Sequence, residues 1–400
     1  MQFSTNVEKL KPSATIAVST LAKRLAAEGR DIVNLSAGEP DFDTPDFISR
    51  AAIEGIRSGW TRYTAPAGLP ELRKAIVAHL SSRAGRALDW NGVVVTAGVK
   101  QALFNTIFTL FGPGDEVLIA APYWTTYPDL VNIARAEPKT VFGAESNDFK
   151  ITAADLEAAS SEHTLGLILN SPCNPTGAVY SLEELEAITV WARDRGVWLI
   201  SDEIYRNIYH DDDREAAGGV LDLPQSSVGD FVLLDGASKS YAMTGWRIGY
   251  SYSSAELAQK FTALQSQITS NTSTPSQAAA LEAFSNIDEA QASIAAMSVA
   301  FTRRRDLVTA RMDELMPGVP YTRPHGAFYL YFRVDGFFDD DVRDATAWCS
   351  RLLESQGVAL VPGAAFGDDR WVRMSFATSD DVLEDAFKRI ATMVSTGVAS

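Results

Sequence analysis

One lysine in this 400-residue sequence lies in a setting suited to covalent chemistry. Lys239 is part of GASKSYAMTGWRIGY, residues 236–250, directly after the strand-like run FVLLD. A cofactor bound as a Schiff base needs a lysine at a strand end, a nearby anion site for a phosphate, and little bulk between them. Ser238 offers a hydroxyl and Arg247 a forked guanidinium for that phosphate. Most lysines are merely solvated, so the hypothesis depends on this whole segment.

An acid follows another apolar run in the same manner. Asp202 lies in SDEIY after VWLI, where a buried carboxylate could keep a pyridine ring nitrogen protonated. Tyr205, three residues further, and Asn174 in NSPCNPTG could donate hydrogen bonds to a ring oxygen of the same cofactor. An acid in this position is more often a helix cap, and NPTG by itself is a good turn sequence.

Two further segments could complete a cofactor site. In VTAGVKQALFN a strand turns through Gly98 into a helix, where the backbone N–H groups of Val99 and Lys100 would be free to hold phosphate. Trp124 in APYWTTYP follows the next strand and could stack on a cofactor ring. The ordinary alternatives are a common strand-glycine-helix turn and a core tryptophan.

A substrate contact is predicted at Arg373 in WVRMSFAT. A guanidinium inside a short apolar strand needs an anionic partner, because an unpaired buried charge is costly. The carboxylate of a substrate could bind it with two hydrogen bonds. A salt bridge to an acid of the same chain explains the pattern equally well.

The elements that must position these residues follow two patterns. From residue 93, apolar runs at 93, 116, 165, 197, 231 and 247 alternate with helical stretches. Such runs are typical of strands buried on both faces of a mainly parallel sheet. A long amphipathic helix at 288–315 then leads to a smaller α+β unit with strands at 326–334, 357 and 371 and a helix at 341–355. The first 45 residues are too few for a domain and are expected to pack on this unit.

Composition excludes several classes of protein. The formal net charge of −16 and the dispersed basic residues argue against nucleic acid binding. The sequence has no apolar run long enough for a membrane span and no recognisable signal peptide, so a cytoplasmic protein is expected. Cys173 and Cys349 have no metal-ligand spacing, so no metal site is predicted. HDDDREAAGG at 210–219 is interpreted as an acidic surface loop.

Taken together, these motifs resemble those of the class I and II aminotransferases, in the family's order and over nearly the whole chain. The resemblance implies the α/β fold of the fold type I transferases, which depend on pyridoxal 5′-phosphate (PLP). It has a large domain with a mainly parallel seven-stranded sheet and a small α+β domain. The expected boundaries are an N-terminal arm and part of the small domain at 1–46, a large PLP-binding domain at 47–288, and the C-terminal small domain at 289–400.

The resemblance also implies roles for individual residues. Lys239 would hold the cofactor and act as the base, with Asp202 and Tyr205 as its catalytic partners. For the substrate, Arg373 would bind the α-carboxylate and Gly38 in AGEPDF would add a backbone contact, with Trp124 and Asn174 nearby. Tyr63 in TRYTAPAGLPELR matches a tyrosine that crosses a dimer interface to the partner's cofactor phosphate, which implies a homodimer.

The sequence is most similar to the bacterial-type branch of aspartate aminotransferases. The implied reaction moves an amino group from aspartate to 2-oxoglutarate by a ping-pong route through a pyridoxamine form of the cofactor, so amino acids and 2-oxo acids are the expected partners. No counterpart of the partner-subunit arginine for a distal carboxylate is evident. Members of the branch use the KPSAT segment instead, which indicates Lys11, Ser13 and Thr15.

Other functions remain open at this stage. Prephenate, aromatic or alanine substrates would use the same site, and fold type I also includes C–S lyases. A transcription regulator with an aminotransferase-like domain would need a basic helix-turn-helix domain in front. About 90 residues precede the first sheet strand and contain family motifs throughout, which argues against that class.

Overall fold

A seven-stranded sheet forms the centre of the molecule. The computed structural model describes residues 10, 14–211 and 213–397. The strand order is β2-β8-β7-β6-β5-β3-β4, and every strand except β8 runs in the same direction. The strands of this sheet are β2 (Val93–Thr96), β3 (Glu116–Ala121), β4 (Glu137–Phe142), β5 (Thr164–Asn170), β6 (Trp198–Asp202), β7 (Phe231–Gly236) and β8 (Gly249–Tyr252).

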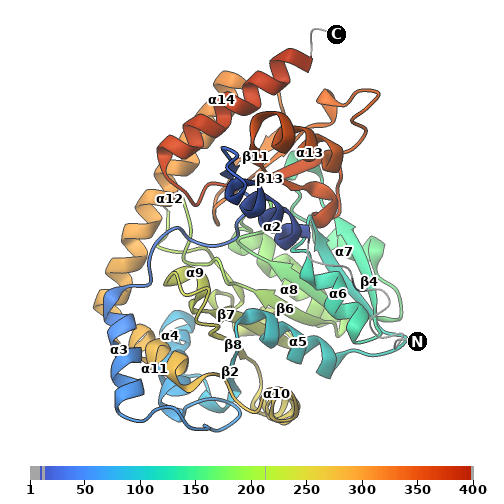
Figure 1. Cartoon of the computed structure of the whole chain (residues 1–400). Helices are drawn as coiled ribbons and strands as arrows, with labels where there is room; N and C mark the ends of the chain where they lie inside the picture. The colour runs from blue at the N-terminus through green and yellow to red at the C-terminus, as the bar shows by residue number, and fades with distance from the viewer. Residues whose placement is uncertain (1–9, 11–13, 212, 398–400) are drawn as a thin grey trace, which may run out of the picture.

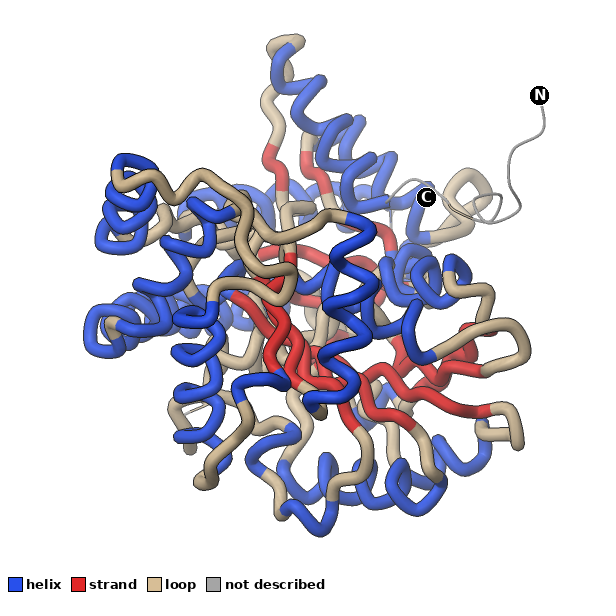
Figure 2. The backbone as a smooth tube through the Cα atoms, turned by 90° about the horizontal axis from the view of Figure 1, so that it is seen from below, coloured by secondary structure: helices blue, strands red, loops and turns tan. Residues whose placement is uncertain are grey.

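Helices cover both faces of this sheet (Figures 1 and 2). Successive residues of β6 show why: Leu199 packs in one hydrophobic core with α3, α4, α8 and α11, and Ile200 packs in another with α5, α6 and α10. Side chains of a strand alternate between its faces, so both faces must be apolar. The helices are α2 (Ala14–Ala27), α3 (Asp46–Arg57), α4 (Pro70–Ala84), α5 (Val99–Leu110), α6 (Thr126–Ile133), α7 (Ala153–Ala159), α8 (Leu182–Arg195), α9 (Ala237–Ser240), α10 (Ala255–Ile268), α11 (Thr274–Ser285), α12 (Ile287–Leu315), α13 (Ala345–Gln356) and α14 (Asp380–Gly397).

A smaller unit contains the C-terminal strands and part of the N-terminal segment. Its four-stranded sheet has the order β12-β13-β10-β9, and β1 pairs with β11 in parallel. Helix α2 lies against β1, β11 and β12, and α12 runs between the two units (Figure 1). The domain boundaries at 46 and 288 remain predictions. The strands are β1 (Val33–Asn34), β9 (Tyr321–Thr322), β10 (Tyr329–Arg333), β11 (Val358–Ala359), β12 (Val361–Pro362) and β13 (Trp371–Ser375).

Several sequence expectations need correction. The strand β4 was not among the predicted runs, because its residues EPKTVF are mostly exposed at the edge of the sheet. The single strand predicted at 357 is two short strands that join different sheets, β11 and β12. The loop at 210–219 is only partly a surface loop, because His210 and the segment 217–219 are buried. No helix among the described residues is long and apolar enough to cross a lipid bilayer.

Candidate active site

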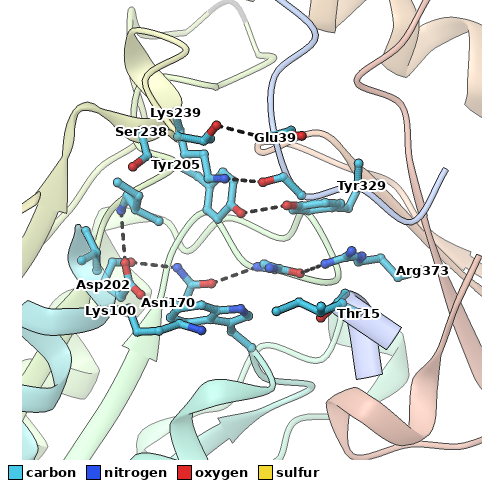
Figure 3. A pocket seen from close by; sticks show the side chains of 18 of the residues that line it. Thr15, Glu39, Lys100, Asn170, Asp202, Tyr205, Ser238, Lys239, Tyr329 and Arg373 are labelled. Atoms are coloured by element: carbon cyan, nitrogen blue, oxygen red, sulfur yellow. Dashed lines mark hydrogen bonds between the residues drawn. The ribbon is translucent and has the colours of Figure 1, made fainter. Parts of the chain in front are cut away.

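The predicted residues meet at one edge of the large sheet. Strands β5, β6 and β7 are parallel neighbours, and Asn170, Asp202 and Leu234 lie side by side where they end. Loops after the carboxyl ends of such strands are where open α/β sheets bind ligands. A pocket of about 380 Å³ opens there (Figure 3). The predicted residues that line it are Thr15, Gly38, Val99, Lys100, Trp124, Asn174, Asp202, Tyr205, Ser238, Lys239, Arg247 and Arg373.

Three predicted residues are not found in the pocket. Lys11 and Ser13 lie outside the described residues. Tyr63 does not line the pocket, and its side chain is 89% exposed. Ile56 and Trp60, a few residues earlier in the chain, are exposed apolar side chains as well.

Lys239 lies on the short helix α9, directly after β7. Its ammonium donates a hydrogen bond to the carbonyl oxygen of Gly38. Burial in the pocket lowers the pKa of Lys239 to about 8, an effect opposed by the carboxylate of Glu39 and reinforced by Arg373. A lysine with this pKa is neutral in part near neutral pH, as a nucleophile or base requires.

Asp202 is 2% exposed at the end of β6. The hydroxyl of Tyr127 donates a 2.7 Å hydrogen bond to its Oδ2, and the amide of Ile204 donates one of 3.3 Å to its Oδ1. Burial raises the pKa of Asp202 to about 6 despite these donors. None of the described residues forms an ion pair with Asp202, so a cationic group in the pocket would stabilise its charged form.

An anion-binding corner lies at the start of α5. Gly98 begins this helix with a φ of 80°, and the structure records no side-chain cap. A Cβ at Gly98 would lie 2.4 Å from Nη2 of Arg247, so only glycine permits the guanidinium to approach the helix end. Arg247 donates to two carbonyl oxygens, of Thr244 at 2.8 Å and of Ala97 at 3.3 Å, and has no acidic partner among the described residues. Free helix amides and an unpaired guanidinium together suit a phosphate.

Arg373 is buried on the opposite wall, where it is 2% exposed. Its Nη1 donates to Oδ1 of Asn174 at 2.9 Å and its Nη2 to the carbonyl oxygen of Ser36 at 2.8 Å. Its guanidinium lies 4.3 Å from the ring centre of Tyr329. No acid among the described residues pairs with it, so the alternative of an internal salt bridge is not observed. A carboxylate ligand would compensate this buried charge.

A chain of hydrogen bonds joins the two ends of the site (Figure 3). Asn174 accepts from Arg373 and donates its backbone N–H to Oδ1 of Asn170 at 2.9 Å, and Nδ2 of Asn170 donates to the carbonyl oxygen of Asp202 at 2.9 Å. On the adjacent wall the hydroxyls of Tyr205 and Tyr329 are 2.8 Å apart, and burial raises the pKa of both. These hydroxyls therefore stay protonated as hydrogen-bond donors.

The sequence alone did not identify several residues of the site. Tyr127 lies three residues after Trp124, and Asn170, the last residue of β5, lies four residues before Asn174. Both could have been inferred because they are close in sequence to a predicted residue. Glu39 follows the predicted Gly38 in the same segment, whereas Tyr329 reaches the pocket only through tertiary packing. The other lining residues that sequence reasoning missed are Ile16, Ser19, Ser36, Ala37, Ile204 and Thr244.

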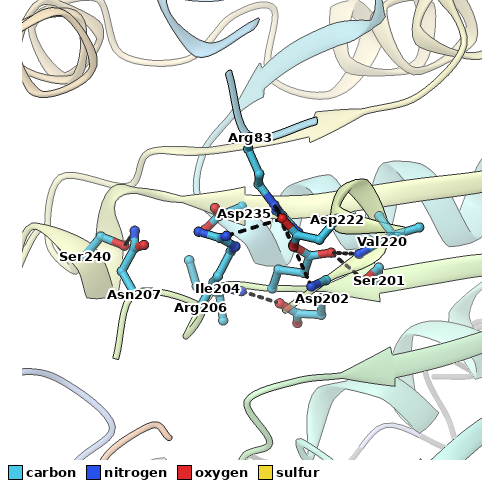
Figure 4. Close-up of polar contacts among 12 residues, drawn as sticks. Arg83, Ser201, Asp202, Ile204, Arg206, Asn207, Val220, Asp222, Asp235 and Ser240 are labelled. Carbon is cyan, nitrogen blue, oxygen red and sulfur yellow. Dashed lines mark hydrogen bonds and ion pairs between the residues drawn. The ribbon is translucent and has the colours of Figure 1, made fainter. Parts of the chain in front are cut away.

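A second cluster of charges lies on the other side of β6 (Figure 4). Glu203, next to Asp202, pairs with Nη1 of Arg83 at 2.5 Å and accepts hydrogen bonds from Ser201 and from the amide of Val220, each at 2.9 Å. Arg83 also pairs with Asp222 at 2.9 Å. Arg206 lies 3.6 Å from Asp222, so two arginines face two acids, and none of the four lines the pocket.

Comparisons with known proteins agree with this geometry. The sequence model of the family "Aminotransferase class I and II" matches residues 30–390. The aspartate/prephenate aminotransferase of Cereibacter sphaeroides is 43% identical over 97% of both chains, and the aspartate aminotransferase of Streptomyces avermitilis is 39% identical over 98% of this chain and 97% of the relative.

Solved structures show the same fold. The aspartate aminotransferase of Thermus thermophilus with maleate superposes with a TM-score of 0.92 at 37% identity, covering 98% of this chain and 100% of that structure. The Rhizobium meliloti aspartate aminotransferase gives a TM-score of 0.91 at 36% identity over 99% of each chain. The predicted fold with its mainly parallel seven-stranded sheet is thus confirmed, and the chain is an enzyme that belongs to the class I and II aminotransferases.

Proposed function

We propose that this enzyme transfers an amino group between aspartate and 2-oxoglutarate, with pyridoxal 5′-phosphate bound through Lys239. The observation that carries the proposal is a combination of four features in one pocket. They are a lysine with a lowered pKa, an anion-binding corner, a buried acid and a buried arginine, and neither of the last two has a partner of opposite charge among the described residues. The names of the relatives support aspartate as a substrate.

The residues present fit this cofactor. The amides of Val99 and Lys100 and the guanidinium of Arg247 suit its phosphate, with the hydroxyl of Ser238 beside them. Asp202 suits its ring nitrogen and Trp124 its ring face. When bound, pyridoxal phosphate supplies an aldehyde for the amine and a ring that withdraws electrons from the substrate's Cα. The hydroxyl of Tyr205 and Nδ2 of Asn174 would donate hydrogen bonds to its phenolic oxygen. For Asn174 the donor must be Nδ2, because Oδ1 already accepts from Arg373.

The chain's own groups then have distinct tasks. Arg373 binds the α-carboxylate through two N–H groups and so fixes the direction of the Cα–H bond. Nζ of Lys239 would take the proton from the substrate's Cα. The carboxylate of Asp202 keeps the ring nitrogen protonated, because the pairing lowers the free energy of both charges.

Recognition of a second carboxylate needs one more cation. Lys11 remains the predicted residue but lies outside the described residues. Among the described residues that line the pocket, the cations are Lys239, Arg247, Arg373 and Lys100, and the first three have tasks already. The ammonium of Lys100 lies 5.0 Å from the ring centre of Trp124, which also lines the pocket. We therefore include Lys100 as a second candidate for the distal carboxylate.

A panel of half-reactions tests this function. Stopped-flow absorbance should show rapid loss of the cofactor band with aspartate and glutamate, and slower loss with alanine. Lys11→Ala and Lys100→Ala should be compared with wild type, because the residue that binds the distal carboxylate should slow the dicarboxylic substrates selectively. Equal rates with alanine and aspartate in the wild type would contradict aspartate specificity.

Prephenate is a second candidate acceptor, because relatives such as the Cereibacter sphaeroides enzyme are named for aspartate and prephenate. Adding arogenate and phenylalanine to the same panel decides whether the enzyme accepts substrates with a ring in the side chain. Steady release of ammonia from aspartate or cystathionine, without accumulation of the aminated cofactor, would favour a lyase instead.

The active assembly is proposed to be a homodimer that shares its sites through Tyr63. Its hydroxyl would reach the phosphate of the partner's cofactor, which agrees with its 89% exposure in the single chain. Sedimentation should give a dimer mass, and Tyr63→Phe should weaken cofactor retention without changing that mass. A cytoplasmic location stays a prediction.

A further inference from the structure

A strap of ten residues, defined as 35–44, forms one wall of the pocket. It has no helix or strand of its own and runs from the small unit towards α3, passing α12 on the way (Figure 1). Backbone hydrogen bonds of Leu35 with Ala359 and Ser375 hold one end, and Thr44 holds the other by donating to Ala242 and accepting from Trp246. Side-chain contacts therefore decide where the middle of the strap lies. The strap residues that line the pocket are Ser36, Ala37, Gly38 and Glu39.

Two functional cations bind directly to the backbone of this strap. Arg373 donates to the carbonyl oxygen of Ser36, and Lys239 donates to the carbonyl oxygen of Gly38. On the same strap Oε2 of Glu39 accepts a 3.0 Å hydrogen bond from Thr244, beside the cofactor lysine. The position of the strap therefore sets the distance between the carboxylate site and the amine site.

The strap is fixed at its middle by one ion pair. Nη1 and Nη2 of Arg304 donate to Oδ1 and Oδ2 of Asp41 at 2.7 and 2.8 Å, a two-pronged contact that fixes orientation as well as distance. The side chain of Arg304 is 8% exposed and lies about equally close to the rings of Phe42 and Phe301, 5.5 and 5.6 Å from their centres. Its Nε also lies 3.7 Å from Oδ1 of Asp380, so this buried guanidinium has two carboxylate partners, of which only Asp41 belongs to the strap.

The helix that supplies Arg304 also reaches the opposite wall. The next residue, Arg305, donates to the carbonyl oxygens of His210 and Pro324, each at 3.2 Å. His210 lies five residues after Tyr205, and Pro324 lies five residues before Tyr329; these two tyrosines line the pocket away from the strap. One turn of α12 thus contacts the supports of both walls.

From this arrangement we propose that Arg304 is a positioning residue of the reaction: through Asp41 it holds the strap so that Ser36 and Gly38 face Arg373 and Lys239. This inference rests on the proposed transamination. A displaced strap would misalign the bound carboxylate relative to Lys239, and small misplacements of a reacting group cost large factors in rate.

The test compares two neighbouring arginines in the full-length enzyme loaded with cofactor. Arg304→Gln should raise the KM for aspartate and lower kcat/KM by roughly tenfold or more. It should also weaken binding of maleate, an unreactive dicarboxylate, followed by the absorbance of the bound cofactor. Arg303→Gln is the matched control, because Arg303 is exposed and its substitution removes an ion pair with Asp380 while both acids that pair with Arg304, Asp41 and Asp380, stay in place; it should leave all three values unchanged.

A second pair of variants separates positioning from mere stability. Arg304→Lys keeps the positive charge but cannot form the two parallel hydrogen bonds of a guanidinium. Compared with Arg304→Gln, it should restore the melting temperature more fully than kcat/KM. Asp41→Asn should reproduce the kinetic defect, and the double variant Asp41→Asn/Arg304→Gln should be no worse than either single change, since one contact is lost in all three.

Unchanged KM and maleate binding in folded Arg304→Gln and Asp41→Asn would overturn the inference, as would independent, additive defects. If Arg304→Gln does not fold, Asp41→Asn and Arg304→Lys decide by the same readouts. Failure of the wild type to react with aspartate would contradict the proposed function instead, and is visible before any variant is made.

Discussion

Asp202 and Glu203 are adjacent acids, almost fully buried, yet their surroundings differ completely. Asp202 faces the pocket and receives hydrogen bonds only from neutral groups, a tyrosine hydroxyl and a backbone amide. Glu203 faces the other side of the sheet and is paired with Arg83. The two residues show that burial alone does not define a functional acid.

What distinguishes them is the missing partner. The charge of Glu203 is already compensated, so its task is complete in the folded chain. The charge of Asp202 has no cation among the described residues, and burial raises its pKa to about 6. An uncompensated acid in a cavity is poised to stabilise a cationic ligand, at some expense to the stability of the empty protein.

The largest expected effect is the loss of catalysis in Asp202→Asn. Without the carboxylate, nothing in the described pocket holds a proton on the ring nitrogen, so kcat should fall roughly 10²- to 10³-fold, as when one preorganised electrostatic group is removed. The protein should remain folded. Steady-state kinetics with aspartate measure kcat, and circular dichroism checks that the variant is folded.

Glu203→Gln is the matched change on the other face. It should lower the free energy of unfolding by about 3 kcal/mol, because Arg83 stays buried with Asp222 as its remaining partner. The kcat should stay within about threefold of wild type, a change of under 1 kcal/mol in the barrier. A large loss of kcat in a folded Glu203→Gln enzyme would contradict the division between the two faces.

The pH dependence of stability should show the same contrast. The pKa of Asp202 rises from an ordinary value of 3.8 to about 6 in the folded protein, so protonation favours folding. The stabilisation of the fold by protonated Asp202 is complete below pH 4 and is lost as the pH rises through 6. The free energy of unfolding of the cofactor-free wild type, measured in urea, should therefore fall by up to about 3 kcal/mol between pH 4 and 7 relative to that of Asp202→Asn. A difference that does not vary with pH would contradict the raised pKa.

The smallest effects should come from two hydroxyl donors. Tyr127→Phe removes the 2.7 Å hydrogen bond to Asp202 and should weaken both kcat and cofactor retention severalfold. Ser201→Ala removes the 2.9 Å hydrogen bond to Glu203 and should lower the free energy of unfolding by about 1 kcal/mol without changing kcat. Cofactor release, followed by absorbance during dialysis, separates the two variants. Equal kinetic losses would show that both faces serve the reaction.

Residues that depend on local chemistry could be predicted from the sequence. Lys239, Asp202 and Arg247 lie in contiguous segments after apolar strands, and parallel strands bring such segments to one edge. The core strands were predicted because continuous apolar runs indicate burial on both faces.

The rest depends on tertiary contacts that leave little local signal. The edge strand β4 is polar, since half of its side chains face solvent, and the strand predicted at 247 starts at 249 because Arg247 has a left-handed φ of 57°. Tyr329 reaches the pocket through folding of a distant segment. Its assignment to the site required coordinates.

The reversed direction of β8 has a consequence for where Lys239 and Arg247 lie. Strand β7 ends beside Lys239, and the chain turns back at once, so that Arg247 enters β8 from the same edge. A parallel strand would begin at the far end of the sheet, several residues of rise away from the lysine. Because of this return, one short peptide brings both the lysine and the arginine to the pocket, so an insertion between them should change their spacing.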